Sequence, residues 1–311
     1  DSRLSRGLGD VYKRQVGNIM TDKGKVILVT GASRGVGKGI AESVGKPGDT
    51  IICVGRSVDS GTTVNQFGFE INSSLIDTAS NIEKQGIECD VLPADLNLKK
   101  DIQNIQSIIE DKYGRLDMLI HAACQIHDDL VLPKPFWEKS TDLWSVIEVG
   151  LKSNYFLSHA LASMLIKTPK SLVVQISSHG SSCYMHGPIY GAQKAGIDKM
   201  AFDMAFDFKD HDVCSISLWS GIVLDEKTEK VSKNMDEQYA EFLKGAASQA
   251  FAGKVIRAFY DQENKMQHSG KTLIAAEVGK ELGITNPDGT QPRSDREMLG
   301  GPKDFNEAVV Y

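Results

Sequence analysis

The chain has few cysteines, and their spacing argues against two classes of protein. Five cysteines are scattered along 311 residues, with no CxxC pair and an odd total. A disulfide framework uses paired cysteines, and a structural zinc site uses closely spaced pairs of cysteine or histidine. We therefore expect no metal site, and a reduced, cytoplasmic compartment.

The sequence also lacks long apolar runs and blocks of basic residues. No segment approaches the ~20 apolar residues of a membrane-spanning helix, so we expect no membrane span. The formal charge is −6, which gives no electrostatic footprint for nucleic acid. Charged residues make up 24% of the chain and hydrophobic residues 41%, as in an ordinary globular protein.

The first residues lack the features of a targeting segment. Residues 1–19 contain no initiating methionine, no apolar stretch and little periodicity, which excludes a secretory signal. We expect Met20 to be the natural start and residues 1–19 to be a disordered or non-native leader. Residues 20–282 then form one domain, and residues 283–311 a C-terminal extension.

From Gly24 onward, short β-branched runs alternate with segments of helical periodicity. The expected strands are 26–29, 50–54, 89–93, 118–122, 172–176, 213–219 and 271–275. The expected helices are 35–44, 76–85, 99–113, 141–164 and 190–208, with a long polar loop over 57–78. This alternation predicts an α/β fold, a doubly wound parallel sheet of the Rossmann type with right-handed crossovers.

A glycine-rich turn lies between the first strand and the first helix. It reads TGASRGVG from Thr30 to Gly37. Glycines at such a turn let the backbone approach a pyrophosphate, and the helix N-terminus favours its negative charge. Between a strand and a helix, this spacing predicts a dinucleotide site. Its expected contacts are Gly31, Ser33, Arg34, Gly35, Val36 and Gly37.

The end of the second strand bears on the choice of dinucleotide. An acidic residue there would bond the 2′-hydroxyl of NAD, whereas an arginine accommodates the 2′-phosphate of NADP. The residue is Arg56, and Arg34 could make a second contact. The alternative is that both arginines are merely solvated. We expect NADP(H) to be preferred, with NAD(H) possible.

A second motif follows the strand predicted over 172–176. Ser178 comes at the strand end, and Tyr190 and Lys194 lie four apart on the next helix, where they share one face. A free tyrosine has a pKa of about 10, and a nearby ammonium lowers it. Such a tyrosine can give a proton to a carbonyl oxygen or take one from an alcohol. A Tyr-x-x-x-Lys pair alone also occurs by chance in many helices.

The two motifs together make the chain resemble the short-chain dehydrogenase/reductase family over about residues 24–273. TGASRGVG matches the family's cofactor loop, and Ser178, Tyr190 and Lys194 match its catalytic serine and YxxxK pair. Strand alignment favours Ser178 over Ser177. The resemblance implies that Tyr190 is the acid/base and that Lys194 also binds the nicotinamide ribose. It implies further cofactor contacts at Asp95, Leu96, Ala122, Gly221 and Val223.

Within the family, the chain is most similar to the subgroup called dehydrogenase/reductase member 1. Shared segments are FWE at 136–138, SLWxGIV at 217–223 and the long run at 269–289. There are also departures from the family. Its active-site asparagine falls at Gly150, where we expect room for an ordered water beside Lys194, with Asn154 one turn later. Its Pro-Gly pair after the sixth strand is Ser220-Gly221, and its following threonine is Asp225.

These matches predict an NAD(P)-dependent oxidoreductase, in particular an NADPH-dependent carbonyl reductase or alcohol dehydrogenase. The substrate is then a small carbonyl or alcohol, beneath an expected lid over 224–251 that carries Tyr239, Phe242, Leu243 and Phe251. The alternative is a cofactor-binding regulatory or scaffold protein with little or no turnover. The resemblance also implies a homodimer or homotetramer, built through the helices over 141–164 and 190–208.

Overall fold

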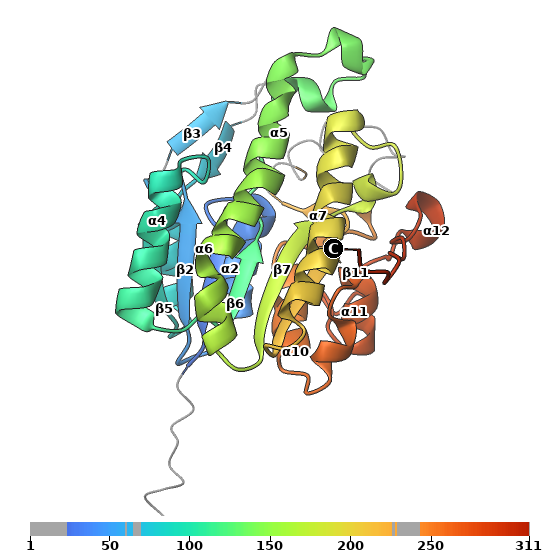
Figure 1. Cartoon of the computed structure of the whole chain (residues 1–311). Coiled ribbons are helices and arrows are strands. Elements are labelled where there is room, and N and C mark those ends of the chain that lie inside the picture. Colours follow the sequence, from blue (N-terminus) through green and yellow to red (C-terminus); the bar gives the residue numbers. More distant parts are fainter. Residues whose placement is uncertain (1–23, 60, 65–69, 226–227, 229–242, 311) are drawn as a thin grey trace, which may run out of the picture.

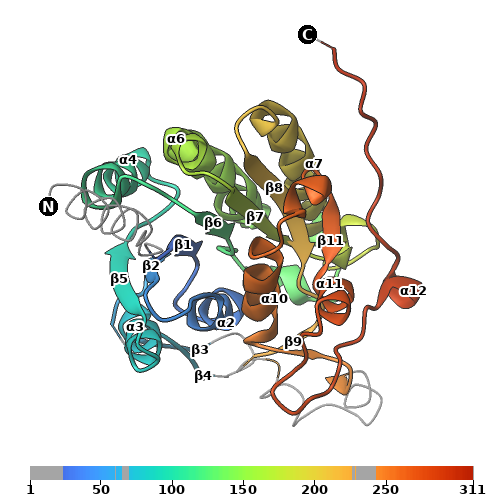
Figure 2. The same cartoon turned by 90° about the horizontal axis from the view of Figure 1, so that it is seen from below.

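The computed structural model describes residues 24–59, 61–64, 70–225, 228 and 243–310. Seven parallel strands form one central sheet (Figure 1), and their order is β11-β8-β7-β6-β1-β2-β5 (Figure 2). Their bounds are β1 Val26–Thr30, β2 Thr50–Gly55, β5 Glu88–Pro93, β6 Met118–His121, β7 Ser171–Ser177, β8 Val213–Trp219 and β11 Thr272–Ile274. The predicted Rossmann-type parallel sheet is confirmed.

The strand order places the predicted cofactor site at the carboxyl end of β1, in the middle of the sheet. β1 pairs with β2 on one side and with β6 on the other. The chain therefore changes direction across the sheet at β1, and crevices for ligands form at the carboxyl ends of strands at such a switch point. The glycine-rich turn directly follows β1 and opens into this crevice.

Helices cover both faces of the sheet (Figure 2). One face carries α4 (Lys99–Ile108), α6 (Ser153–Lys167) and α7 (Pro188–Phe208), and the other carries α2 (Gly35–Val44), α3 (Leu75–Glu83) and α10 (Phe251–Tyr260). Each face has its own apolar core, as β-strands buried on both sides require. Ile27 and Ile51 pack towards α2 and α10, whereas Leu28 and Ile52 pack towards α4 and α6.

Helix α2 packs closely against α10 and the residues just before it, with one glycine on each side of the contact. A Cβ on Gly39 would lie 2.0 Å from the carbonyl oxygen of Gln249, and a Cβ on Gly253 would lie 2.1 Å from Ser43 Oγ. The Ser43 hydroxyl donates to the carbonyl of Ala250 at 2.9 Å. Small residues are therefore required on both helices for this contact.

Three regions differ from the sequence expectation. The helix predicted over 99–113 is α4 followed by a π-helical turn, η1 (Ile109–Tyr113). The stretch predicted as a long polar loop contains an antiparallel hairpin, β3 (Gly61–Val64) with β4 (Glu70–Ser73). The long helix predicted over 141–164 is divided into a 3-10 turn, a short α5 (Ser145–Ile147), a π-helical turn η5 (Glu148–Lys152) and α6. Polar, weakly periodic residues hid the hairpin, and helical periodicity does not reveal a π-turn.

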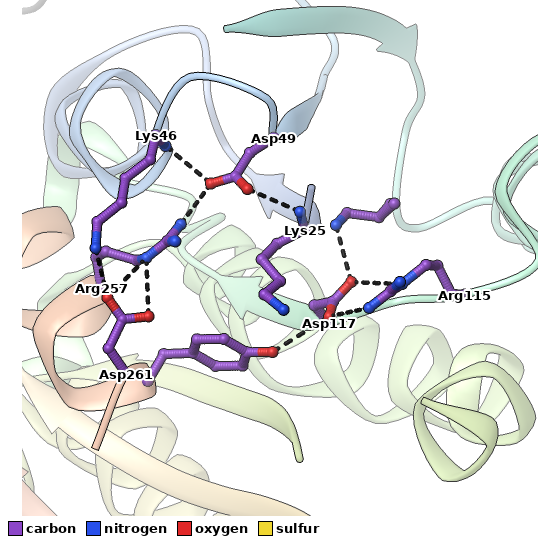
Figure 3. Close-up of polar contacts among 9 residues, drawn as sticks. Lys25, Lys46, Asp49, Arg115, Asp117, Arg257 and Asp261 are labelled. Atoms are coloured by element: carbon purple, nitrogen blue, oxygen red, sulfur yellow. Dashed lines mark hydrogen bonds and ion pairs between the residues drawn. The ribbon is translucent and has the colours of Figure 1, made fainter. Parts of the chain in front are cut away.

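The amino ends of the strands are joined by a network of ion pairs (Figure 3). Asp49 accepts hydrogen bonds from the backbone N–H of Lys25 at 2.7 Å and of Lys46 at 2.8 Å, and also from the Arg257 guanidinium. Asp117 accepts from the N–H of Val26 and from Arg115. The Tyr260 hydroxyl donates to Asp117 at 3.2 Å.

The C-terminal segment lies against the rest of the chain after α11 (Ala275–Glu281). Asn286 donates to the carbonyl of Ala246 and accepts from the N–H of Ser248, so it clasps the short strand β10 (Ala247–Ser248). Further along, α12 (Arg296–Leu299) is tied to α11 by the Arg296–Glu277 ion pair. Within the described ranges, no helix combines the length and apolarity needed to cross a membrane.

Candidate active site

The glycine-rich turn has the backbone shape that an anion site needs. Gly31 and Gly35 have φ values of +70° and +56°, which favour glycine. A Cβ on Gly37 would lie 2.2 Å from the carbonyl oxygen of Gly31, so only glycine lets α2 begin this close to β1. Arg34 is the N-cap of α2 but makes no side-chain capping bond, and the first turn holds no acidic residue. The turn therefore fits a pyrophosphate.

The buried hydroxyl of Thr30 fixes the other wall of the crevice. Thr30 Oγ1 accepts from the backbone N–H groups of Ala122 and Ala123, both at 3.1 Å. A Cβ on Gly31 would lie 2.8 Å from the Cα of Ala123. The two hydrogen bonds to Thr30 set the spacing between β1 and the turn after β6. Sequence reasoning placed Ala122 near the cofactor and missed the role of Thr30.

The residues predicted to meet the adenosine lie at the ends of β2 and β5. Arg56 is exposed at the end of β2, and its Nη2 donates to Gln125 Oε1 at 3.1 Å. Asp95 is half-buried and accepts from the N–H of Asn97 at 3.0 Å. Leu96 is buried in the core towards α4, so its backbone rather than its side chain is available to a ligand.

The segment after β8 lies near the glycine-rich turn. Gly221 has a φ of +71°, and Val223 is buried in β9 (Val223–Leu224), where it pairs with Ala247. A Cβ on Gly35 would lie 3.4 Å from Asp225 Oδ2. The Asp225 carboxylate therefore lies close to the start of α2, and its other oxygen accepts from Thr228.

Most of the predicted lid lies outside the described residues, including Tyr239 and Phe242. Leu243 is buried. Phe251 was expected in the lid, but it is the first residue of α10 and is fully buried in the main core. A Cβ on Gly279 would lie 2.4 Å from its ring. Phe251 therefore packs inside the molecule and does not face a substrate.

Ser178 and Tyr190 are brought together at the carboxyl end of β7. The two hydroxyl oxygens lie 3.0 Å apart, and both side chains are half-buried. The backbone N–H of Gly180 donates to Ser178 Oγ at 3.2 Å. A Cβ on Gly180 would lie 2.5 Å from Cε1 of the Tyr190 ring. The turn after Ser178 thus orients the serine and supports the tyrosine ring.

Lys194 is buried beside this pair. Its Nζ lies 5.4 Å from the centroid of the Tyr190 ring and donates to the carbonyl of Ile176 at 3.3 Å. Only 5% of the residue is exposed. The neighbouring Ser177 hydroxyl donates to the backbone carbonyl of Lys194. Ser177 therefore binds α7, and Ser178 is the serine that meets Tyr190.

The space at Gly150 is not open to water as expected. A Cβ on Gly150 would lie 1.6 Å from Gln193 Nε2 and 2.8 Å from its Cδ. Asn154, expected to assist, donates to Gln175 Oε1 at 2.8 Å instead. The amide of Gln193 fills the side-chain position that glycine vacates. The motif YGAQK contains this residue, but nothing in its spacing indicated the contact.

A buried carboxylate links α7 to β8. Asp198 Oδ1 accepts from the hydroxyl of Ser217 at 2.6 Å, and the indole N–H of Trp219 donates to Asp198 at 3.1 Å. Burial raises the pKa of Asp198, and the hydrogen bonds oppose this rise. Asp198 continues the four-residue spacing from Tyr190 and Lys194, and that spacing could have indicated its inward position.

The C-terminal segment reaches the turn that follows Ser178. The Ser182 hydroxyl donates to the carbonyl of Leu299 at 3.3 Å. His179 is buried, and its ring centroid lies 4.8 Å from that of Trp219. The charge of Asp295, in the C-terminal segment, acts on this imidazole. Burial lowers the pKa of His179, although Asp295 partly opposes this. Family motifs do not extend to this segment, so the sequence did not reveal its contact with the site.

Comparison with known proteins agrees with this architecture. The sequence model of the short chain dehydrogenase family matches residues 25–236. The human protein "Dehydrogenase/reductase SDR family member 1" is 31% identical over 277 residues, which cover 86% of this chain and 84% of that protein. Its mouse counterpart is 30% identical over 289 residues, covering 89% of this chain and 88% of that protein.

Solved structures show the same fold at lower identity. A 3-oxoacyl-[acyl-carrier protein] reductase from Brucella melitensis, in complex with NAD, has a TM-score of 0.66 at 18% identity, covering 81% of this chain and 95% of that one. L-sorbose reductase from Gluconobacter frateurii, complexed with NADPH and L-sorbose, has a TM-score of 0.66 at 19% identity, with the same coverage. The chain belongs to the short-chain dehydrogenase family and is an NAD(P)-dependent oxidoreductase of CH–OH and C=O groups.

Proposed function

We propose that the protein is an NADPH-dependent carbonyl reductase in which Ser178, Tyr190 and Lys194 hold and protonate the substrate oxygen. The observation that carries this proposal is the 3.0 Å contact between the Ser178 and Tyr190 hydroxyls, beside the buried ammonium of Lys194. Ser178 and Tyr190 are both partly exposed residues, and their short separation allows one substrate oxygen to contact both hydroxyls.

The hydrogen bonds around Ser178 define its role. Its oxygen accepts the N–H of Gly180, so its own proton is available to Tyr190 or to a substrate oxygen. Tyr190 then gives its proton to that oxygen as negative charge develops there, and Ser178 stabilises the same oxygen by a hydrogen bond. Lys194 Nζ lies 5.4 Å from the centroid of the Tyr190 ring, so a positive charge there stabilises the negative charge that develops as the proton leaves.

The glycine-rich turn supports the cofactor part of the proposal. Gly31, Gly35 and Gly37 form a cradle that any Cβ would fill, at the start of a helix without an acidic first turn. With its pyrophosphate at this turn, the dinucleotide would supply a hydride in reduction and accept one in the reverse reaction. Arg56 supports the preference for NADPH, because it lies exposed at the end of β2.

One experiment tests the function directly. Cofactor binding is followed by NADPH fluorescence, and turnover by NADPH consumption with a panel of aldehydes and ketones. We expect binding, turnover with at least one carbonyl compound, and a ~100-fold or greater loss of turnover in Tyr190→Phe with binding retained. Near-normal turnover in Tyr190→Phe would refute the assigned role.

The scaffold alternative has one observation in its favour. The carboxylate of Asp225 lies near the start of α2, where it would repel a phosphate. If the wild type binds NADPH but consumes none with any carbonyl or alcohol, the scaffold function is favoured. Asp225→Thr distinguishes a site weakened by this charge, because the substitution should then tighten NADPH binding.

We also propose that the protein works as a cytoplasmic homodimer or homotetramer. Tyr155 and Phe156 are exposed on α6, with 51% and 46% of each residue accessible. Such aromatic surface is typical of an interface. The five cysteines are all free thiols, which supports a reduced, cytoplasmic compartment. We further propose that residues 283–311 are a C-terminal extension, whose described part contacts the turn after Ser178 through Leu299.

The proposed assembly can be tested in solution. Light scattering at micromolar protein would refute assembly by showing only monomer.

A further inference from the structure

A hollow of about 370 Å³ lies beside Tyr190, between the chain that follows β6 and the turn that precedes α7. One wall is formed by Leu130 to Pro135, and the other by Tyr184 and His186. The His186 ring meets the Tyr190 ring edge to face, with 5.1 Å between their centroids. Leu130 also belongs to the small apolar cluster against which Tyr190 packs. The hollow therefore adjoins the group to which we assign proton transfer.

The lining of this hollow carries positive charge and, among the described residues, no carboxylate. Its two lysines are Lys134 and Lys139. Glu138 precedes Lys139 in the chain, but it is exposed in η3 (Phe136–Glu138) and does not line the hollow. Neither lysine forms an ion pair within the part of the chain that the structure describes. A cleft lined by one sign of charge attracts ligands of the opposite sign.

Lys139 is held in place before any ligand arrives. Its Nζ donates to the carbonyl of Leu130 at 2.9 Å and to that of His186 at 3.4 Å, so it joins the two walls. An ammonium has three N–H groups, which leaves one for a ligand. The residue is half-buried, so its charge is less screened than that of a fully exposed lysine. A fixed cation with a remaining donor is well suited to bind a carboxylate.

The position of this ammonium limits the size of the ligand. A Cβ on Gly187 would lie 3.9 Å from Lys139 Nζ and 3.9 Å from the Tyr184 hydroxyl oxygen. Gly187 is the N-cap of α7, and Tyr190 follows in its first turn. The two positions are within one turn of the helix, a rise of about 5 Å. An anion bound at Lys139 and an oxygen bound at Tyr190 can therefore belong to one small molecule.

We propose that this hollow binds a carboxylate of the substrate, and that the substrate is an oxo acid, an aldehyde or ketone that also carries a carboxylate. Lys139 and Lys134 determine this specificity, while the carbonyl oxygen contacts Ser178 and Tyr190. This inference rests on the proposed function. The carboxylate is unchanged in the reaction. A hydride from NADPH adds to the carbonyl carbon, Tyr190 gives its proton to the oxygen, and the products are the hydroxy acid and NADP⁺.

A matched pair of substrates isolates the charge. 4-Carboxybenzaldehyde and its methyl ester present the same aldehyde and differ by one negative charge. We expect the wild-type kcat/KM to be about tenfold higher for the acid, because the ester makes no charge-assisted hydrogen bond. Lys139→Met removes the charge from a side chain of similar length, and should abolish this roughly tenfold preference. Lys134→Met should lower it about threefold, because Lys134 is exposed.

The ratio of the two kcat/KM values separates charge recognition from loss of structure. If Lys139→Met lowers both values and leaves their ratio unchanged, Lys139 only joins the two walls and the anion site is overturned. Lys139→Arg keeps a cation and should retain the preference for the acid. Lys167→Met removes a charge at the end of α6 and should leave the ratio as in the wild type. Should Lys139→Met not fold, Lys134→Met carries the same comparison.

The outcomes also distinguish this proposal from the function on which it rests. A wild type that reduces no aldehyde or ketone refutes the proposed function. A wild type that reduces the ester as well as the acid, or only uncharged carbonyl compounds, retains that function and overturns the anion site. A preference for the acid that survives in both Lys139→Met and Lys134→Met would likewise overturn it, because the carboxylate would then bind elsewhere.

Discussion

The two ends of the central sheet use polar residues in opposite ways. At the amino ends, Asp49 and Asp117 each collect several donors from backbone and side chains, so their bonding capacity is largely used. At the carboxyl ends, and among the described residues, Lys194 Nζ makes one hydrogen bond and Gln193 Nε2 one weak contact with a sulfur. Completed networks hold a fold together, whereas groups with unused donors and acceptors remain available to a ligand.

The largest expected effect tests the amino end. Asp117 is fully buried and accepts from Val26, Arg115 and Tyr260. Asp117→Ala leaves those donors unpaired and should cost about 3 kcal/mol of unfolding free energy, because buried pairs lose that much when one partner is removed. Asp203→Ala, in an exposed pair with Lys199, should cost under about 0.5 kcal/mol. Urea denaturation compares them, and equal losses would contradict the contrast.

The next effect tests whether the carboxyl end depends on geometry. Gly180→Ala places a Cβ 2.5 Å from the Tyr190 ring, so the ring must move away from Ser178. We expect kcat to fall about 100-fold with unchanged NADPH binding, since small misplacements of catalytic groups have this effect. Gly191→Ala is the matched control, because its Cβ would lie at an ordinary 3.4 Å from the carbonyl of Gly180. Similar kcat values for both variants would show that the ring tolerates displacement.

A third prediction concerns the pH dependence of stability. Burial lowers the pKa of His121, at the end of β6, from its ordinary value of 6.5 to about 3. Between these two pH values His121 is protonated in the unfolded state but not in the folded state. The free energy of unfolding therefore decreases as the pH falls from about 6.5 to about 3. By pH 5 the loss is about 2 kcal/mol relative to pH 7.5. His121→Asn should flatten this part of the curve.

The control for that prediction is a histidine on the surface. His211 is exposed after α7, and His211→Asn should leave the pH dependence of stability as it is in the wild type. Denaturant midpoints measured between pH 5 and pH 7.5 make the comparison. The same slope in His121→Asn and the wild type would show that folded His121 accepts a proton in this range.

The smallest effect concerns cofactor choice at the edge of the site. Arg56→Asp should weaken NADPH binding about tenfold and improve the relative binding of NADH, because a charged hydrogen bond to the 2′-phosphate is lost. Lys280→Asp makes the same charge change on α11 and should leave the ratio of the two affinities unchanged. A wild type that already prefers NADH would exclude the assignment to Arg56.

Sequence periodicity was sufficient for most of the fold. The strand at 213–219 and the helix at 35–44 have the predicted bounds, since a buried parallel strand and an amphipathic helix each leave a local pattern. The hairpin β3–β4 was missed because its polar residues carry no such pattern. The π-turn η5 was missed because the chain stays helical from α5 through α6, with no proline or cap to mark a change.

The candidate site was predictable where a local motif defines it. Ser178, Tyr190 and Lys194 follow from a strand end and a four-residue spacing, which the fold converts into proximity. The Gln193–Gly150 contact joins two helices, and the contact of Ser182 with Leu299 joins segments 117 residues apart. Contacts of this kind depend on how finished elements pack, which a single sequence does not encode in any short window.

The close packing of α2 against α10 also has a consequence for the order of folding. The Ser43–Ala250 hydrogen bond joins residues 207 positions apart. While the chain is being synthesised, the face of α2 that carries Gly39 stays uncovered until α10 has emerged. Long-range closure of this kind slows folding and exposes apolar surface to aggregation in the meantime. Nascent chains stopped before α10 should therefore bind chaperones. In such chains the glycine-rich turn is already synthesised, but the face of α2 that packs against α10 is still exposed.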